Sequence, residues 1–143
     1  MYKERLFTPG PTQLLPSVQT AMAQPIVHHR TEEFRNIFKE VLDGLKYVYN
    51  TQNDVICFAA SGTGAMEGAV VNLLAPGDRA IVVSAGKFGE RWTALCKAFG
   101  IDTHVISIPY GEAVDPEQVE AMLKQHPDSR AVFVQYSESS TGA

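Results

Sequence analysis

The chain has 143 residues, of which 45% are hydrophobic, and a formal net charge of −4. This length and apolar content suffice for one domain with a buried core, and an acidic balance without basic clusters argues against nucleic acid as a partner. No stretch approaches the roughly 18 apolar residues of a membrane span, and the N-terminus lacks the apolar core of a signal peptide, so we expect a soluble, cytoplasmic protein with no membrane partner.

Residues 1–30 are expected to form an N-terminal arm. The stretch Thr8–Thr12 contains two prolines, which donate no backbone hydrogen bond and have a fixed φ, so it cannot be a helix or a central strand. We expect it to be extended, with a short helix near residues 18–22.

A long amphipathic helix is predicted to follow this arm. Thr31 is a favourable N-cap, and Glu32 and Glu33 would lie in the first turn, next to the positive end of the helix dipole. Apolar residues then recur every three or four positions from Phe34 to Tyr49, which is the spacing of one helix face.

A glycine-rich turn is the most informative stretch. The apolar run Val55–Ala60 predicts a buried strand, and the segment Ser61–Gly68 leads from it into a second apolar run that predicts a helix. Free N–H groups at such a helix start form an anion site, and the Thr63 hydroxyl adds a donor. A P-loop would need a lysine that is absent here, and the interval from Gly64 to Gly68 is one residue too long for the dinucleotide pattern G-x-G-x-x-G. A simple tight turn explains the glycines equally well.

The rest of the chain alternates between strand and helix patterns. Strands are predicted at 80–84, 103–108 and 131–135, and helices at 90–99 and after the N-cap Asp115. Together with the run at 55–60, four apolar strands separated by helices predict an α/β fold with a parallel sheet covered on both faces. Loops at the carboxyl ends of such strands should line one pocket.

The cysteines and histidines indicate neither a disulfide nor a metal site. Cys57 falls in the predicted strand and Cys96 on an apolar helix face, so both are expected to be free and buried. The four histidines lack ligand spacing with cysteine or carboxylate residues, so no metal is expected.

Five motifs, in order and in register, resemble the class V aminotransferases, and most closely the branch of alanine–glyoxylate and serine–pyruvate aminotransferases. The motifs are Thr8–Thr12, His29–Arg35, Ser61–Glu67, Gly86–Trp92 and Ser137–Gly142. The resemblance implies pyridoxal 5'-phosphate (PLP) as cofactor, the three-layer, mostly parallel large domain of fold type I with strand order 3-2-4-5-6-7-1, and a homodimer.

The resemblance also implies roles for individual residues. It places the PLP phosphate on Thr63, Gly64 and Ala65, the pyridine ring against Phe88, and the ring oxygen within hydrogen-bonding distance of Ser139.

The arm residues Gly10 and Pro11 match a segment that approaches the substrate. His28 and His29 are interpreted as structural, and Lys87 as a solvated neighbour of Phe88.

The implied activity is the transfer of an amino group from a small amino acid, alanine or serine, to an α-keto acid, glyoxylate or pyruvate. The alternatives are a cysteine desulfurase or another PLP lyase of the same fold, or a non-catalytic module with a phosphate pocket. Phe88, where such lyases tend to have histidine, counts against the first.

In the family, the lysine that forms an imine with the cofactor and the aspartate that pairs with its ring nitrogen lie downstream of the Ser137–Gly142 loop. We therefore expect residues 31–143 to be the N-terminal part of the PLP-binding domain, to hold no catalytic residue, and to be inactive alone.

Overall fold

The computed structural model describes residues 5–143 of the protein, so the first four residues, on which part of the signal-peptide argument rests, lie outside it. The chain divides into two compact units, Met1–Ala59 and Ala60–Ala143. No helix among the described residues is long and apolar enough to cross a membrane.

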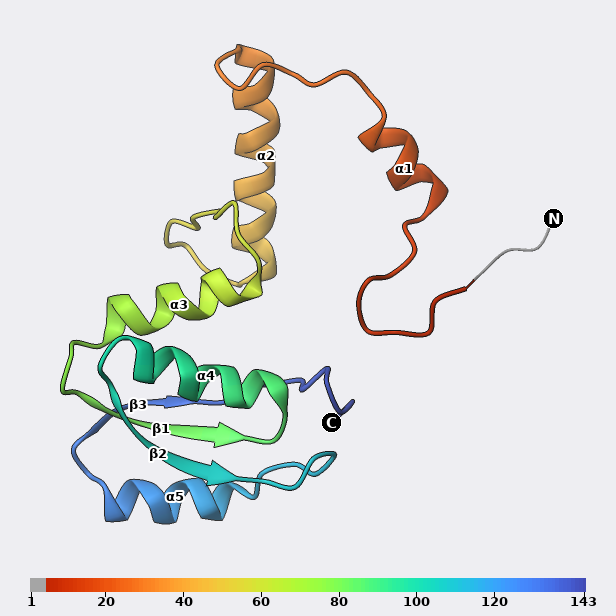
Figure 1. Cartoon of the computed structure of the whole chain (residues 1–143). Helices are drawn as coiled ribbons and strands as arrows, with labels where there is room; N and C mark the ends of the chain where they lie inside the picture. The colour runs from red at the N-terminus through yellow and green to blue at the C-terminus, as the bar shows by residue number, and fades with distance from the viewer. Residues whose placement is uncertain (1–4) are drawn as a thin grey trace. The chain divides into compact units, whose positions relative to one another are not determined.

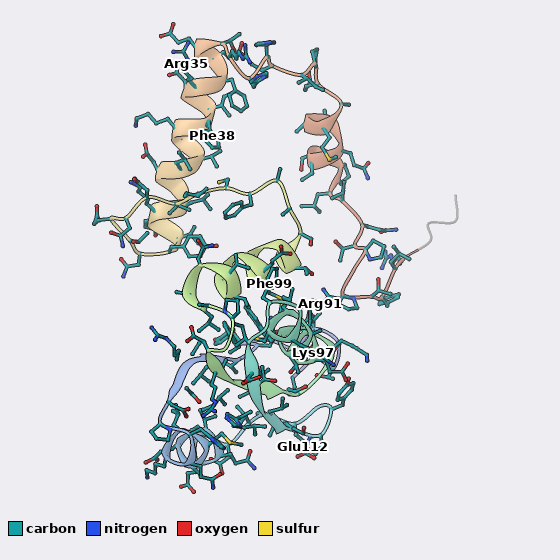
Figure 2. All side chains as sticks on the ribbon, turned by 60° about the vertical axis from the view of Figure 1, so that its left-hand side comes forward. Arg35, Phe38, Arg91, Lys97, Phe99 and Glu112 are labelled. Atoms are coloured by element: carbon teal, nitrogen blue, oxygen red, sulfur yellow. The ribbon has the colours of Figure 1, made fainter. Side chains whose placement is uncertain are left out.

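The first unit carries two helices, α1 (Pro16–Met22) and α2 (Glu32–Val48) (Figure 1). The Thr31 hydroxyl accepts the N–H of Phe34 at 3.3 Å, which confirms the predicted N-cap of the long helix. The stretch Thr8–Thr12 is exposed and forms neither helix nor strand, as predicted. Figure 2 shows Arg35 and Phe38 along α2, whose apolar side chains include no fully buried residue.

The predicted strand at Val55–Ala60 is wrong, because this run pairs with no other strand of the described chain. Ile56 and Phe58 are 73% and 68% exposed, and Cys57 is exposed rather than buried. An apolar run becomes a strand only where its N–H and C=O groups meet a neighbouring strand. The order expected from the resemblance puts this run at the far edge of the sheet, separated from the other three strands by strands that residues 5–143 do not form.

The second unit is a three-layer α/β structure. Helix α3 (Gly62–Leu73) precedes three parallel strands, β1 (Arg79–Ser84), β2 (Asp102–Ser107) and β3 (Ser129–Phe133). The crossovers contain α4 (Lys87–Ala98) and α5 (Pro116–Gln125). Within the described residues the sheet order is β2-β1-β3, which matches the 3-2-4 portion of the order expected from the resemblance.

Two apolar layers cover the central strand β1, in which residues 80–83 are at most 3% exposed. On one face Val82 packs in a cluster with Cys96 and Phe133, and the rings of Trp92 and Phe133 stack with centroids 4.6 Å apart. On the other face Ile81 packs in a cluster that includes residues of α5. Figure 1 shows α3 and α4 on one side of the sheet and α5 on the other. The predicted three layers and the buried, free Cys96 are therefore confirmed.

The start of α4 rests directly on the end of β1. A Cβ atom added to Gly89 would lie 2.7 Å from the Cα of Ser84 and 3.0 Å from the carbonyl oxygen of Val83. Only glycine permits this approach, which fixes the position of the neighbouring Phe88.

We expect Gly89→Ala to lower the free energy of unfolding by about 1–3 kcal/mol, because the added methyl group meets backbone that cannot yield cheaply. Gly68→Ala in α3 is the matched control, since its added Cβ meets nothing within 4 Å and gains up to about 1 kcal/mol of helix propensity. Chemical denaturation of both variants measures the difference. Equal stability of the two would contradict the close packing of α4 on β1.

Candidate functional site

A pocket of about 330 Å³ lies in the second unit, where the carboxyl ends of the parallel strands meet. Its lining comes from the start of α3, the start of α4 and the segment after β3. The lining residues are Ser61, Gly62, Thr63, Met66, Phe88, Arg91, Gln135 and Ser139.

The pocket brings together three of the residues that the resemblance singled out, Thr63, Phe88 and Ser139. Gly64 and Ala65 follow Thr63 in the first turn of α3, although they are not among the lining residues. The proposed substrate residues Gly10 and Pro11 belong to the other unit, in an exposed stretch.

The N-terminus of α3 is open to an anion. Ser61 is the N-cap but makes no side-chain capping hydrogen bond, and the first turn contains no acidic residue. The Gly64 N–H donates to the Ser61 carbonyl at 2.9 Å, but no side-chain anion satisfies the first-turn N–H groups or the positive end of the helix dipole beside the pocket. A Cβ on Gly64 would come 2.6 Å from the Cβ of Ala60, so glycine is required for the tight entry into this helix.

Arg91 adds a positive charge to the same place. Its Nη1 donates to Oγ1 of Thr63 at 2.7 Å, and its guanidinium carbon lies 5.1 Å from the centre of the Phe88 ring. Sequence reasoning missed this residue. The predicted helix at 90–99 begins after Phe88, whereas α4 begins at Lys87, so the spacing of three that places the two side chains on one face was not recognised.

The N-terminus of α4 is closed by an internal carboxylate. Glu138, 2% exposed, accepts the N–H of Phe88 at 3.1 Å and the N–H of Gly89 at 3.0 Å. The Ser140 hydroxyl donates to the same carboxylate at 2.5 Å. In the sequence Glu138 is one residue of the Ser137–Gly142 motif, and no local pattern indicates that it caps a helix.

Glu138 is charged at neutral pH. Burial raises the pKa of its carboxyl, but hydrogen bonds from the Ser140 hydroxyl and from the N–H groups of Gly89 and Phe88 outweigh this effect and hold the pKa below its ordinary value of 4.5. The negative charge therefore occupies the α4 N-terminus, and an external anion is directed to α3.

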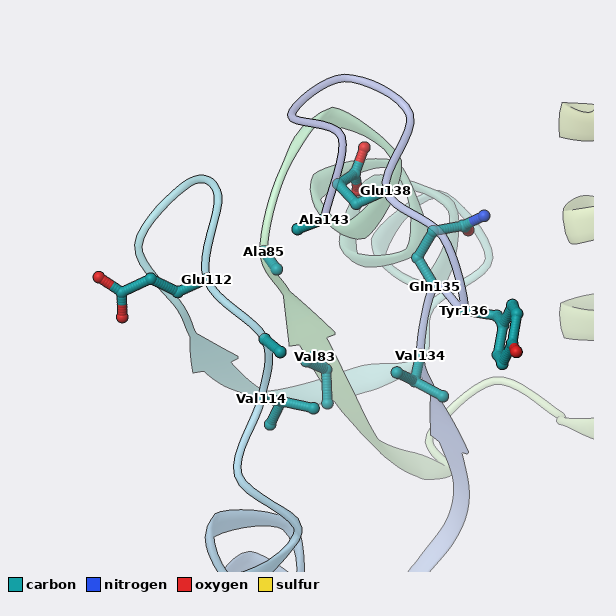
Figure 3. A pocket seen from close by; sticks show the side chains of 10 residues that line it. Val83, Ala85, Glu112, Val114, Val134, Gln135, Tyr136, Glu138 and Ala143 are labelled. Carbon is teal, nitrogen blue, oxygen red and sulfur yellow. The ribbon is translucent and has the colours of Figure 1, made fainter.

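Glu138 also lies at the rim of a second, mostly apolar pocket of about 260 Å³ at the carboxyl ends of β1 and β3. Figure 3 shows it above Ala85 and close to Ala143, with Val83, Val114 and Val134 deeper in the pocket.

Comparison with known proteins decides the family. The family model described as aminotransferase class-V matches residues 6–143. The chain belongs to this family. Membership implies PLP as the cofactor. The pocket of this class-V aminotransferase chain fits the chemistry of PLP: the open helix N-terminus and the arginine beside it suit the phosphate, and the aromatic side chain suits the ring.

Several known proteins are similar to this chain. It is 43% identical over 142 residues to the small subunit of a soluble hydrogenase from Synechococcus sp., and 34% identical over 141 residues to an L-aspartate–glyoxylate aminotransferase from Paracoccus denitrificans. These matches cover 98% and 96% of this chain but 37% and 35% of the relatives. The crystal structure of an alanine–glyoxylate aminotransferase from Nostoc sp. matches with a TM-score of 0.87 and 34% identity, over all of this chain and 38% of that one. The chain thus spans little more than a third of these proteins.

Lys87 is exposed, as expected of a solvated neighbour of Phe88. Its Nζ donates to Oε2 of Glu90 at 2.7 Å, and its side chain is 67% exposed. The hydrogen bond with Glu90 and the negative charge of that residue raise the pKa of the Lys87 amine. The amine is therefore protonated at neutral pH and is a poor nucleophile.

The two histidines before α2 make contacts that fit a structural role. The His28 carbonyl accepts the Thr31 hydroxyl at 2.8 Å, and its Nδ1 accepts the N–H of Arg30 at 3.1 Å. The rings of His28 and His29 stack. Among residues 5–143 no group of three or more histidine, cysteine or carboxylate side chains is arranged to hold a metal ion.

We expect Glu138→Gln to lower the free energy of unfolding at neutral pH by about 1.5–3 kcal/mol. The glutamine side chain places an uncharged amide, with its own N–H donors, opposite the N–H donors that the carboxylate satisfies. Since the pKa of Glu138 is lower in the folded state, its contribution is present above about pH 4.5 and is lost as the pH falls below that value. The free energy of unfolding, measured from pH 7 to pH 3, should therefore fall less steeply in Glu138→Gln than in the wild type.

Glu112→Gln is the control, since the Glu112 side chain is exposed (Figure 3). The pH dependence of the free energy of unfolding of Glu112→Gln should parallel that of the wild type. If Glu138→Gln also parallels the wild type, the buried carboxylate does not support the fold.

Proposed function

We propose that the full-length protein is a PLP-dependent aminotransferase that moves an amino group from alanine or serine to glyoxylate or pyruvate. The observation that carries the proposal is the meeting of Thr63, Phe88 and Ser139 in one pocket at the open N-terminus of α3. PLP, when bound, supplies the electron sink for the transfer. The glyoxylate named for the Paracoccus and Nostoc relatives supports glyoxylate as the acceptor.

The residues of this chain would hold and orient the cofactor. The first-turn N–H groups of α3, at Thr63, Gly64 and Ala65, with the Thr63 hydroxyl, bind the phosphate. The Phe88 ring packs against the pyridine ring and excludes water from that face, and the Ser139 hydroxyl hydrogen-bonds the ring oxygen.

The remaining parts of the proposal rest on the family resemblance. Gly10 and Pro11 approach the substrate, and two subunits form a homodimer in the cytoplasm. No lysine lines the described pocket, so the 143-residue chain would not transaminate alone, and the catalytic lysine and aspartate would come from another part of the full-length protein.

The proposal predicts the activity of the purified full-length protein. With glyoxylate as acceptor, we expect alanine or serine to give a kcat/KM at least about tenfold above that of aspartate, measured by coupled assay of the keto acid formed. A visible absorbance band that borohydride removes should accompany this activity. Preference for aspartate would overturn the proposed donor, release of sulfide from cysteine would indicate a lyase, and the absence of both band and activity would leave a phosphate-binding module.

Phe88→Leu should weaken the binding of PLP to the apoprotein by about threefold to tenfold, since stacked aromatic pairs contribute about 0.5–1.5 kcal/mol beyond burial. The matched control is Phe99→Leu, because Phe99 is the C-cap residue of α4 and does not line the pocket, so this variant should leave the affinity unchanged. Absorbance titration measures both. Equal affinities for the two variants would remove Phe88 from the cofactor site.

A further inference from the structure

Arg91 contacts two residues that belong to separate motifs of the proposed cofactor site. Its Nη1 lies 2.7 Å from Oγ1 of Thr63, in the phosphate-binding turn, and its guanidinium group lies over the Phe88 ring. We infer that Arg91 is a positioning residue that fixes the Thr63 hydroxyl as a hydrogen-bond donor to the phosphate and holds the stacking ring in place. This inference rests on the proposed function.

The hydrogen bond from Arg91 determines which way the Thr63 hydroxyl can act. A threonine hydroxyl has one proton and two acceptor lone pairs, whereas arginine can only donate. Because Arg91 occupies a lone pair of Oγ1, the hydroxyl proton remains available for another acceptor. Thr63 is the second residue of α3, at the open helix N-terminus, so a phosphate bound there is the acceptor in reach.

The charge of Arg91 is also available to an anion. Of the nearby carboxylates, Glu90 is engaged by Lys87 and by the Tyr110 hydroxyl, and Glu138 by the start of α4. Across residues 5–143 no carboxylate forms an ion pair with Arg91. An unneutralised guanidinium group beside an uncapped helix N-terminus reinforces the positive potential at that point.

The Phe88 contact gives Arg91 its second role. The distance of 5.1 Å from the guanidinium carbon to the ring centre lies within the range of about 6 Å for cation–π attraction. Phe88 and Arg91 are one turn apart on α4, so the guanidinium group restrains the ring from one side while leaving the ring in the pocket lining.

The test compares Arg91→Met with Lys97→Met in the full-length apoprotein. Both variants remove one positive charge from α4, but Lys97 lies in its last turn and does not line the pocket. Titration with PLP and with pyridoxal, which lacks the phosphate, separates the two ends of the cofactor. Arg91→Met should weaken PLP binding about tenfold or more and pyridoxal binding by less than about threefold, as expected for the loss of a charge-assisted contact. Lys97→Met should bind both like the wild type.

A double-mutant cycle with Thr63→Val tests the coupling. If Arg91 acts through Thr63, Thr63→Val should weaken PLP binding less in the Arg91→Met background than in the wild type. Arg91→Lys keeps a charge and a donor, so it should bind PLP more tightly than Arg91→Met. It replaces the Met variant in the comparison if that variant folds poorly.

Three results would overturn the inference. These are unchanged PLP affinity in Arg91→Met, equal loss of PLP and pyridoxal binding, and strict additivity with Thr63→Val. A wild-type protein that binds no PLP would instead refute the proposed function, and the inference with it.

Discussion

The buried carboxylate of Glu138 is the contact on which the candidate site depends. It joins the segment after β3 to the first turn of α4, 49 and 50 residues away along the chain. This one group keeps Ser139 and Phe88 close together in the lining of the same pocket. Desolvation of the charge is costly, but two backbone N–H groups and the Ser140 hydroxyl offset that cost. The site is thus assembled by a hydrogen-bonded charge rather than by apolar packing alone.

The same carboxylate gives the pocket its polarity. Parallel strands with helical crossovers bring helix N-termini to one edge of the sheet, so both α3 and α4 present a positive end there. Glu138 neutralises the end of α4, whereas α3 has no side-chain cap and has Arg91 beside it. Of two similar helix ends, one is therefore satisfied within the protein and the other is left for a ligand.

Features set by local patterns could be predicted from the sequence. The capped helix at 32–48, the parallel strands and the Asp115 cap follow from residue spacing over a few turns. The grouping of Phe88 and Ser139 follows from the strand edge that their loops share, whereas Thr63, whose turn follows no strand, was placed with them by the family resemblance. The predicted strand at 55–60 and the predicted burial of Cys57 were wrong, because an apolar run forms a buried strand only where a neighbouring strand pairs with it. Arg91 and Glu138 were missed because their partners lie 28 and about 50 residues away.

In the proposed enzyme, the residues of this chain would bind the cofactor but carry out no catalytic step. An uncapped helix, a threonine hydroxyl and an aromatic ring bind a phosphate and a flat ring equally well before and during a reaction. Such uniform binding raises affinity without lowering the chemical barrier. The nearby amine of Lys87 is paired with Glu90 and has a raised pKa, so it would be a poor proton acceptor in the proposed reaction. The rate enhancement of the proposed enzyme would then come from groups that become effective only in the transition state, presented to the reactive face of a ring that this chain would hold in place.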